Sequence, residues 1–340
     1  MANRHYRFIH PPSYATTHLF IALLVLSLSV SVLSQASAAP TQLFKINPTS
    51  EESYAESYTL VARLDNDDYL LLQAMVMNGG FGDEKPACRI LYVPKGKNGI
   101  NEVNREGAWL ASKPEGKLRI GTCVLKETAR GATWEAKTEK MSVKVYLKGQ
   151  KGPSTTSTMN QQVGEKFFEH ELIMPWSKVS VALSVRSQAP LQLKGRGTLN
   201  HTRSTALPPE LSKKMTKVYL FDDDGGALLE LKRKPSGQLT AWSWTSEAKS
   251  PRSLKPTSVG ISNIGGGLRK GDEIKLSING ALYKVQQIKK IYTYEPIKAY
   301  GIAGRLLKKW VGDPLNVTSF IEVRGEKGAM KGFVEEITLR

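Results

Sequence analysis

The chain has 340 residues, 48 basic and 31 acidic side chains, and a formal net charge of +17 at pH 7. A chain of this length can bury a sizeable hydrophobic core, as two domains or as one large β-domain. Its histidines and cysteines form no ligand-spaced cluster, and no dinucleotide or P-loop pattern opens a helix. The sequence therefore predicts neither a metal site nor a bound cofactor.

The first 38 residues have the three parts of a secretory signal peptide. Arg4 and Arg7 form the basic region, Leu19–Leu33 the apolar region, and Ala36-Ser37-Ala38 the small-residue cleavage pattern. The apolar run is shorter than the roughly 20 residues that cross a bilayer, so cleavage is favoured over the alternative, an uncleaved anchor. We predict residues 1–38 as a signal peptide, and export across the inner membrane to the periplasm.

The excess of positive charge indicates the kind of partner. Removing the signal peptide takes away two arginines and no acid, which lowers the net charge from +17 to about +15. An exported protein rarely meets nucleic acid, so this charge favours anionic lipid, lipopolysaccharide or a polyanionic glycan. The alternative is a solubilising surface charge without a partner. We predict peripheral contact with an anionic membrane surface and no nucleic-acid partner.

Short runs of alternating apolar and polar residues recur through the rest of the chain. Turn signals separate them, and Asn279-Gly280 is the strongest hairpin signal. Many short strands at this spacing are typical of a sandwich or barrel, and their near-equal division on either side of residue 195 suggests two. The predicted strands include Tyr58–Leu64, Tyr69–Met77, Leu118–Leu125, Met141–Leu147, Phe167–Ile173, Val179–Val185, Lys217–Phe221, Ala227–Lys232, Leu239–Thr245, Ile274–Ile278, Tyr283–Tyr292, Phe320–Arg324 and Phe333–Leu339.

Two stretches fall outside the strand pattern. Gly149–Gln162 is polar and lacks an apolar period, so we predict a loop. Lys298–Val311 places apolar side chains on one helical face and basic ones largely opposite, which predicts a short helix. With Trp310 near its end, this helix could lie on a membrane surface. Packing over a barrel end is favoured, because two glycines weaken it as a free helix.

Cys88 and Cys123 are the two cysteines of the chain, both on strand-like segments. In an oxidising compartment they could form one disulfide, which would stabilise the fold by a few kcal/mol. They could equally remain two buried thiols. The sequence leaves both possibilities open.

The segment Lys194–Pro209 contains His201 between a Gly-x-Gly turn and a Pro-Pro stop. At a barrel rim, this imidazole could donate a proton or hydrogen-bond a ligand head group. The pattern alone favours a structural histidine at the domain junction. His170 lies between Glu169 and Glu171, and we predict an ordinary alternating strand position for it.

Two adjacent carboxylates occupy opposite faces of the last predicted strand. If the more apolar face points inward, Glu335 is buried and Glu336 is solvated. A buried carboxylate must be paired or protonated. Glu335 could therefore pair with Arg203 or His201, which is favoured, or act as an acid with a raised pKa.

Trp242 and Trp244 project to the same side of one predicted strand. Paired indoles could line an apolar pocket and still offer N–H donors. They could equally be ordinary core, which is the more common outcome.

The segment around His201 resembles a known family. Gly195-Arg-Gly-Thr-Leu-Asn200-His201-Thr202-Arg203 is similar to the pattern that introduces the second of two lipocalin-like barrels in the AttH-like, carotenoid hydratase-like and survival-factor-like group. Weaker likenesses occur at Met77–Asp83, Trp310–Pro314 and Gly332–Glu335. The resemblance implies an all-β fold of two consecutive lipocalin-like antiparallel β-barrels, residues 39–195 and 196–340, with a short helix in the C-terminal half. It also implies a site for an apolar or lipid-like ligand.

One substitution bears on the chemistry that this resemblance implies. In the hydratase branch, an acid and a histidine of the motif are thought to help protonate a carbon–carbon double bond. The histidine is present as His201, but Asn200 stands where aspartate is usual. An amide cannot take part in general acid–base catalysis at neutral pH. Ligand binding is therefore favoured over hydratase chemistry.

The leading hypothesis is an exported, non-enzymatic lipocalin-like protein that binds or transfers a lipid or terpenoid-like ligand in the cell envelope. The alternative is a hydratase, isomerase or cyclase acting on a polyene or other lipid, with His201 or Glu335 as the general acid. A third possibility is an envelope structural protein whose barrels bind no small molecule. The residues predicted to contact the ligand are Asn200, His201, Arg203, Trp242, Trp244 and Glu335.

Overall fold

A computed structural model describes residues 43–78, 82–112, 114–149, 158–223, 225–245, 252–254, 268–275, 282–300, 308, 312–326 and 328–340. All of them belong to one unit, Leu43–Arg340. The predicted signal peptide, the Asn279-Gly280 turn and most of the predicted Gly149–Gln162 loop lie outside the described residues. The loop therefore stays a prediction, although its last residues begin a strand.

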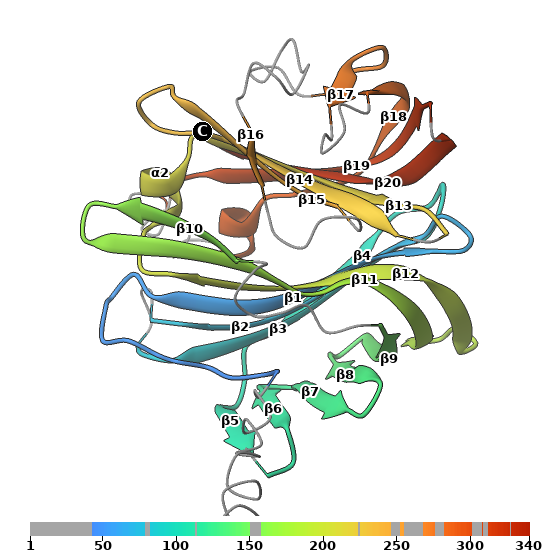
Figure 1. The fold of residues 1–340 in the computed structure, drawn as a ribbon. Coiled ribbons are helices and arrows are strands. Elements are labelled where there is room, and N and C mark those ends of the chain that lie inside the picture. The colour runs from blue at the N-terminus through green and yellow to red at the C-terminus, as the bar shows by residue number, and fades with distance from the viewer. Residues whose placement is uncertain are drawn as a thin grey trace, which may run out of the picture. The chain divides into compact units, whose positions relative to one another are not determined.

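The first half of the chain forms a curled antiparallel sheet of twelve described strands (Figure 1). Its order is β4-β3-β2-β1-β12-β11-β9-β8-β7-β6-β5, and β10 pairs with β11. The strands are β1 (Ala55–Leu64), β2 (Tyr69–Met77), β3 (Lys85–Val93), β4 (Ile100–Asn104), β5 (Trp109–Ser112), β6 (Lys117–Ile120), β7 (Cys123–Thr128), β8 (Gly131–Lys137), β9 (Met141–Lys148), β10 (Thr158–Val163), β11 (Lys166–Val185) and β12 (Leu191–Ser204).

The second half forms another curled antiparallel sheet, with eight described strands in the order β16-β15-β14-β13-β20-β19-β18-β17. The strands are β13 (Lys214–Phe221), β14 (Gly226–Arg233), β15 (Leu239–Thr245), β16 (Arg252–Leu254), β17 (Glu273–Lys275), β18 (Leu282–Tyr294), β19 (Pro314–Gly325) and β20 (Gly328–Leu339). Two short helical turns accompany them, α2 (Pro208–Leu211) and η2 (Pro296–Tyr300). None of the helical segments that the structure describes is long and apolar enough to cross a bilayer.

The predicted fold class is confirmed, because the described chain is nearly all β and forms two consecutive curled antiparallel sheets. Each sheet has the form of a lipocalin-like half-barrel. The predicted Lys298–Val311 helix overlaps η2 at its start, and most of its remaining residues lie outside the described part of the chain.

Two strand boundaries differ from the prediction for local reasons. The predicted strand Leu118–Leu125 is two strands, β6 and β7, because Gly121 has a φ of +56° and turns the chain. Conversely, Phe167–Ile173 and Val179–Val185 belong to one long strand, β11. Register shifts between Leu172 and Ser177 bend it, so that it pairs with β10 in its first half and with β9 in its second.

The alternating side chains of each sheet build two kinds of core. In β2, Leu70 and Leu72 point into the core enclosed by the first sheet, whereas Tyr69 and Leu71 point into an apolar layer shared with the second sheet. A third cluster, which includes Val218, fills the curl of the second sheet. The same alternation decides which residues can reach the space between the sheets.

The chain leaves the first sheet after β12, which pairs with β1 from Gly195 opposite Leu64 to Ser204 opposite Ala55. The second sheet starts at Lys214, in β13. His201 therefore lies in the last strand of the first sheet. The predicted domain boundary at 195–196 stays a prediction, but the change of sheet falls between Ser204 and Lys214.

Cys88 in β3 and Cys123 in β7 form a disulfide, with Cα atoms 5.4 Å apart. Both residues are fully buried in the core of the first sheet. β3 and β7 lie near opposite ends of the strand order, so the bond ties the two sides of the curled sheet together. Of the two possibilities that the sequence left open, the structure has the bridge.

Candidate functional site

A cavity of about 250 Å³ lies where the two sheets face each other. Strands β1, β2, β3, β11 and β12 line it from the first sheet, and β13, β18, β19 and β20 from the second. The apolar side chains of its lining are Leu71, Leu91, Phe168, Met215, Val317 and Ile337. The lining residues that carry polar groups are Ser57, Thr59, Tyr69, Gln73, Arg89, Asn200, Thr202, Lys217, Tyr219, Tyr292, Tyr294, Asn316, Thr318 and Glu335.

Glu335 of β20 is the one carboxylate among the described lining residues. Tyr69 of β2 donates its hydroxyl to Glu335 Oε1, which joins the two sheets through the cavity. Burial raises the pKa of Tyr69 and of Tyr219 well above the usual value, and the nearby Glu335 charge raises it further. Both phenols therefore stay protonated and remain hydrogen-bond donors to the carboxylate.

The predicted pairing of Glu335 with Arg203 or His201 is wrong. His201 and Arg203 lie on the face of β12 that points away from the cavity. On that face they have another carboxylate partner, Glu56. The prediction that Glu335 is buried and Glu336 solvated is also wrong, because both side chains are half-buried. Glu336 lies on the other face of β20 and forms an ion pair of 3.1 Å with Lys214.

A second polar group, the His170 cluster, lies beside the cavity: His170, Asn200, Lys217, Glu230 and Lys232. His170 Nδ1 lies 2.7 Å from Glu230 Oε2, and Nε2 lies 3.3 Å from Asn200 Oδ1. Lys232 Nζ lies 2.8 Å from the Glu230 carboxylate, but the two groups are not aligned for a hydrogen bond. Lys217 Nζ lies 3.6 Å from the same carboxylate. His170 and Glu230 are fully buried. Asn200 and Lys217 connect this cluster to the cavity, because both also line it.

Burial and the Lys217 charge lower the pKa of His170 below its ordinary value, against the opposing effect of Glu230. The imidazole is therefore neutral near pH 7. Burial by itself would raise the pKa of Glu230, but Lys232, Lys217 and His170 hold it well below its usual range. The cluster thus contains one carboxylate for two lysines.

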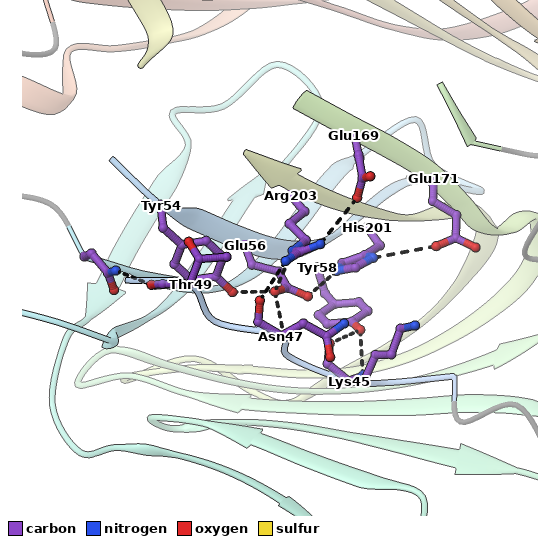
Figure 2. A network of polar contacts seen from close by, with 11 residues as sticks. Lys45, Asn47, Thr49, Tyr54, Glu56, Tyr58, Glu169, Glu171, His201 and Arg203 are labelled. Atoms are coloured by element: carbon purple, nitrogen blue, oxygen red, sulfur yellow. Dashed lines mark hydrogen bonds and ion pairs between the residues drawn. The ribbon is translucent and has the colours of Figure 1, made fainter. Parts of the chain in front are cut away.

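A third group, the His201 cluster, lies on the opposite face of β12, and Figure 2 shows it: His201, Glu56, Glu171, Arg203 and Glu169. His201 Nε2 lies 2.7 Å from Glu56 Oε1, and Nδ1 lies 3.7 Å from Glu171. Burial lowers the pKa of His201, but the two carboxylates outweigh it and the net shift is upward. Arg203 lies 3.8 Å from both Glu56 and Glu169. Carboxylates therefore outnumber cations in this cluster.

The His201 cluster fastens the segment that precedes β1. Glu56 accepts hydrogen bonds from the Tyr54 hydroxyl and from the Asn47 backbone N–H at 2.9 Å. The Tyr58 ring stacks on His201, with ring centroids 4.5 Å apart. Its hydroxyl accepts from the Lys45 N–H at 2.8 Å and donates to the Lys45 carbonyl at 2.6 Å (Figure 2). These contacts give the cluster a structural role.

The structure divides the predicted ligand residues between three places. Asn200 and Glu335 line the cavity, whereas His201 and Arg203 lie in the His201 cluster. Trp242 and Trp244 share one face of β15, as predicted, and pack in the apolar layer between the sheets. None of the described residues forms a group of three or more histidines, cysteines or acids that could hold a metal ion.

The sequence indicated no role for His170, whereas the structure buries it next to Asn200, which lines the cavity. The signal that could have revealed it lies in β14, where the run Ala-Leu-Leu-Glu-Leu-Lys places Glu230 and Lys232 on one face of an apolar strand. Charges in such a run need buried partners.

The two consecutive curled sheets have a double lipocalin-like fold. No family model and no curated protein matches the chain. Solved structures do match it at the level of the fold. A protein of Nitrosomonas europaea assigned as an AttH has a TM-score of 0.55 and 10% identity, covering 90% of this chain and all of that one. CghA, solved with Sch210972, has a TM-score of 0.57 and 9% identity, covering 85% of this chain and 89% of that one.

Kievitone hydratase from Nectria haematococca also matches, at 11% identity and a TM-score of 0.47, over 88% of this chain and 94% of that one. At 10% and 9% identity, the first two matches establish the fold alone. The resemblance to the AttH-like double-barrel group, predicted from the segment around His201, is confirmed in that sense.

Proposed function

We propose that this chain binds a small, largely apolar molecule that carries oxygen groups, of lipid or terpenoid type, in the cavity between its two sheets. The observation that carries the proposal is the composition of the lining. The lining combines aliphatic and aromatic side chains, such as Leu71, Leu91 and Phe168, with hydroxyl, amide and charged groups. Small-molecule sites are concave and combine apolar surface with convergent polar groups.

The size of the site suits an elongated ligand. A second hollow of about 180 Å³ adjoins the cavity and shares Gln73, Arg89, Tyr294 and Asn316 with it. The second hollow adds the apolar side chains of Met75, Met77 and Val103. The structure of CghA with Sch210972 supports the proposal, since a protein of this fold was solved together with a small molecule.

We further propose that binding occurs in the cell envelope, where the protein would transfer its ligand. The basic, apolar and small-residue regions of residues 1–38 support export, and the Cys88–Cys123 disulfide suits an oxidising compartment. The net charge of about +15 expected after cleavage of the signal peptide supports peripheral contact with an anionic membrane surface.

The experiment is to identify small molecules that co-purify with the protein from its native envelope. Thr59 is a half-buried strand residue that lines the cavity, so Thr59→Trp would fill part of it. Thr133→Trp makes the same change at a half-buried position of β8 away from the cavity. We expect native mass spectrometry to find a bound organic molecule in the wild type and the Thr133 variant, and a large loss in the Thr59 variant. Equal occupancy in all three would overturn the proposal.

A second candidate function, hydration or isomerisation of a carbon–carbon double bond, is favoured by Glu335. This carboxyl lines the cavity and is hydrogen-bonded by Tyr69. In its protonated form it could donate a proton to one alkene carbon. Water would then add to the other carbon and return a proton to the carboxylate, so that one water is consumed. His201 is no longer a candidate for this step because it lies outside the lining.

Glu335→Gln separates the two functions, because the amide keeps the volume of the side chain and loses the transferable proton. The isolated ligand is incubated with each protein and analysed by mass spectrometry for a product heavier by one water or isomeric with the ligand. Conversion by the wild type but not by the variant, with binding retained in both, supports catalysis. No conversion by the wild type leaves binding as the function.

A further inference from the structure

We propose that the ligand of the cavity carries an anionic group, such as a carboxylate, and that Arg89 binds it. This inference rests on the proposed function, because it specifies the chemical class of the molecule held between the sheets. The ligand would then be an amphiphilic organic acid.

Arg89 occupies the point where the two hollows meet. It lies opposite Gln73 in β2 and Val103 in β4, and it lines both the cavity and the second hollow. Arg89 is half-buried, which strengthens its interaction with an opposite charge relative to a fully solvated position. An anionic group bound there could have its apolar body in either hollow.

The contacts of Arg89 orient the guanidinium without neutralising it. Its Nε donates to Asn101 Oδ1 at 2.8 Å, and its Cζ lies 4.4 Å from the centre of the Tyr294 ring. No carboxylate among the described residues forms an ion pair with Arg89. A guanidinium held in place by one amide and one aromatic ring keeps donors for a carboxylate, which it binds in a two-pronged geometry.

The charged residues around the cavity also favour an anionic ligand. The lining of the cavity contains two cations, Arg89 and Lys217, and one carboxylate, Glu335. Lys217 shares its carboxylate partner, Glu230, with Lys232. The space between the sheets therefore has an excess of positive charge, and a bound anion would offset it.

Asn316 and Tyr294 stand beside Arg89 in the linings of both hollows. An amide and a phenol can donate to an anionic oxygen, so the site can satisfy more than one lone pair of a carboxylate. Leu71 and Leu91 supply the apolar surface for the rest of the molecule. These features favour an organic acid over a neutral sterol or hydrocarbon.

The test uses two fluorescent probes of nearly the same shape. Anilinonaphthalene sulfonate is an anion, and phenylnaphthylamine is its neutral counterpart without the sulfonate. Both are titrated into the full-length protein, its Arg89→Gln variant and its Arg119→Gln variant. Arg119 is exposed on β6, outside the linings of both hollows, so this control removes one positive charge without changing the site.

We expect the wild type to bind the sulfonate at least tenfold more tightly than the neutral probe. Arg89→Gln should weaken sulfonate binding at least fivefold and leave the neutral probe within twofold, and Arg119→Gln should change neither by more than twofold. Arg89→Lys, which keeps the charge, should restore part of the sulfonate affinity. Circular dichroism of each variant verifies that it is folded.

The possible failures are distinguishable. Tight binding of the neutral probe without preference for the sulfonate would overturn the anionic ligand and leave the proposed function intact. Equal effects of Arg89→Gln and Arg119→Gln on the sulfonate would show attraction by the general surface charge and would also overturn the inference. Binding of neither probe would count against the cavity as a ligand site and would overturn both proposals.

Discussion

The two histidines of the described chain lie on neighbouring strands and have opposite electrostatic surroundings. His170 in β11 and His201 in β12 are both buried and both lie 2.7 Å from a buried glutamate. The pKa of His170 is lowered, by burial and by Lys217, whereas that of His201 is raised, because two carboxylates outweigh burial. Proximity to one carboxylate therefore does not decide the charge of a buried histidine. The balance of all charges in contact decides it.

The two clusters also differ in their position relative to the cavity. In the His201 cluster, carboxylates outnumber cations, and the contacts hold the segment before β1. In the His170 cluster, the cations exceed the single carboxylate, and Lys217 and Asn200 extend to the cavity wall. The positive excess thus lies beside the cavity, where a ligand could offset it.

Among the substitutions that test the difference between the two clusters, Glu230→Gln should have the largest effect on the free energy of unfolding. It leaves Lys232 and Lys217 without a counter-charge, and Lys232 is 1% exposed. Removing one partner of a buried ion pair typically costs about 3–5 kcal/mol. We expect a loss of this size in the free energy of unfolding, measured with urea. The control is Glu273→Gln, at an exposed position of β17, and a loss below about 1 kcal/mol for Glu230→Gln would contradict the role assigned to it.

Glu56→Gln should cost less, about 2–3 kcal/mol, although Glu56 is as fully buried as Glu230. Glu171 and Glu169 remain near His201 and Arg203, so neither cation is left without a carboxylate. Urea unfolding against an exposed control, Glu106→Gln, measures the difference. A loss equal to or larger than that of Glu230→Gln would show that the remaining carboxylates do not compensate.

The alternation of side chains along β12 could be predicted from the sequence, and it correctly places Asn200 and His201 on opposite faces of the strand. The face of β12 that meets the cavity could not be predicted, because it depends on how the second sheet packs on the first. Arg89 went unnoticed for a local reason. The residues after it, Ile90-Leu91-Tyr92-Val93, are continuously apolar, so β3 lacks the alternation that marked the other strands.

The contacts that join the two sheets are distant in sequence. His170 and Glu230 are 60 positions apart, and Tyr69 and Glu335 are 266 apart. A single sequence carries no local pattern for such pairs. The sequence did indicate a carboxylate in an apolar strand at Glu335, whereas the same signal at Glu230 in β14 was missed.

The pH dependence of stability should have opposite signs at the two histidines. Because the folded-state pKa of His201 is raised, its contribution is fully present below the unfolded value of about 6.5 and is lost as the pH rises through the folded pKa. Because that of His170 is lowered, its contribution is present above about pH 6.5 and is lost as the pH falls through the folded pKa.

Urea unfolding from about pH 5 to pH 8 checks these signs. His201→Gln should remove a decline in stability above about pH 6.5, and His170→Gln should remove one below it. NMR of the imidazole protons, assigned with the same variants, provides an independent measurement. A lower titration midpoint for His201 than for His170 would contradict the comparison.

Glu169→Gln should have the smallest effect and shows whether the His201 cluster acts as separate pairs. The Glu169 side chain is 40% exposed and lies 3.8 Å from Arg203, which keeps Glu56 at the same distance and the Phe167 ring 4.9 Å from its guanidinium. Exposed pairs of this kind contribute about 0–1 kcal/mol, so we expect a loss below about 0.5 kcal/mol. A double-mutant cycle with Arg203→Gln measures the coupling. Coupling above about 1 kcal/mol would mean that Glu169, Arg203 and Glu56 form one cooperative network, and the difference between the two clusters would then depend on connectivity as well as on charge.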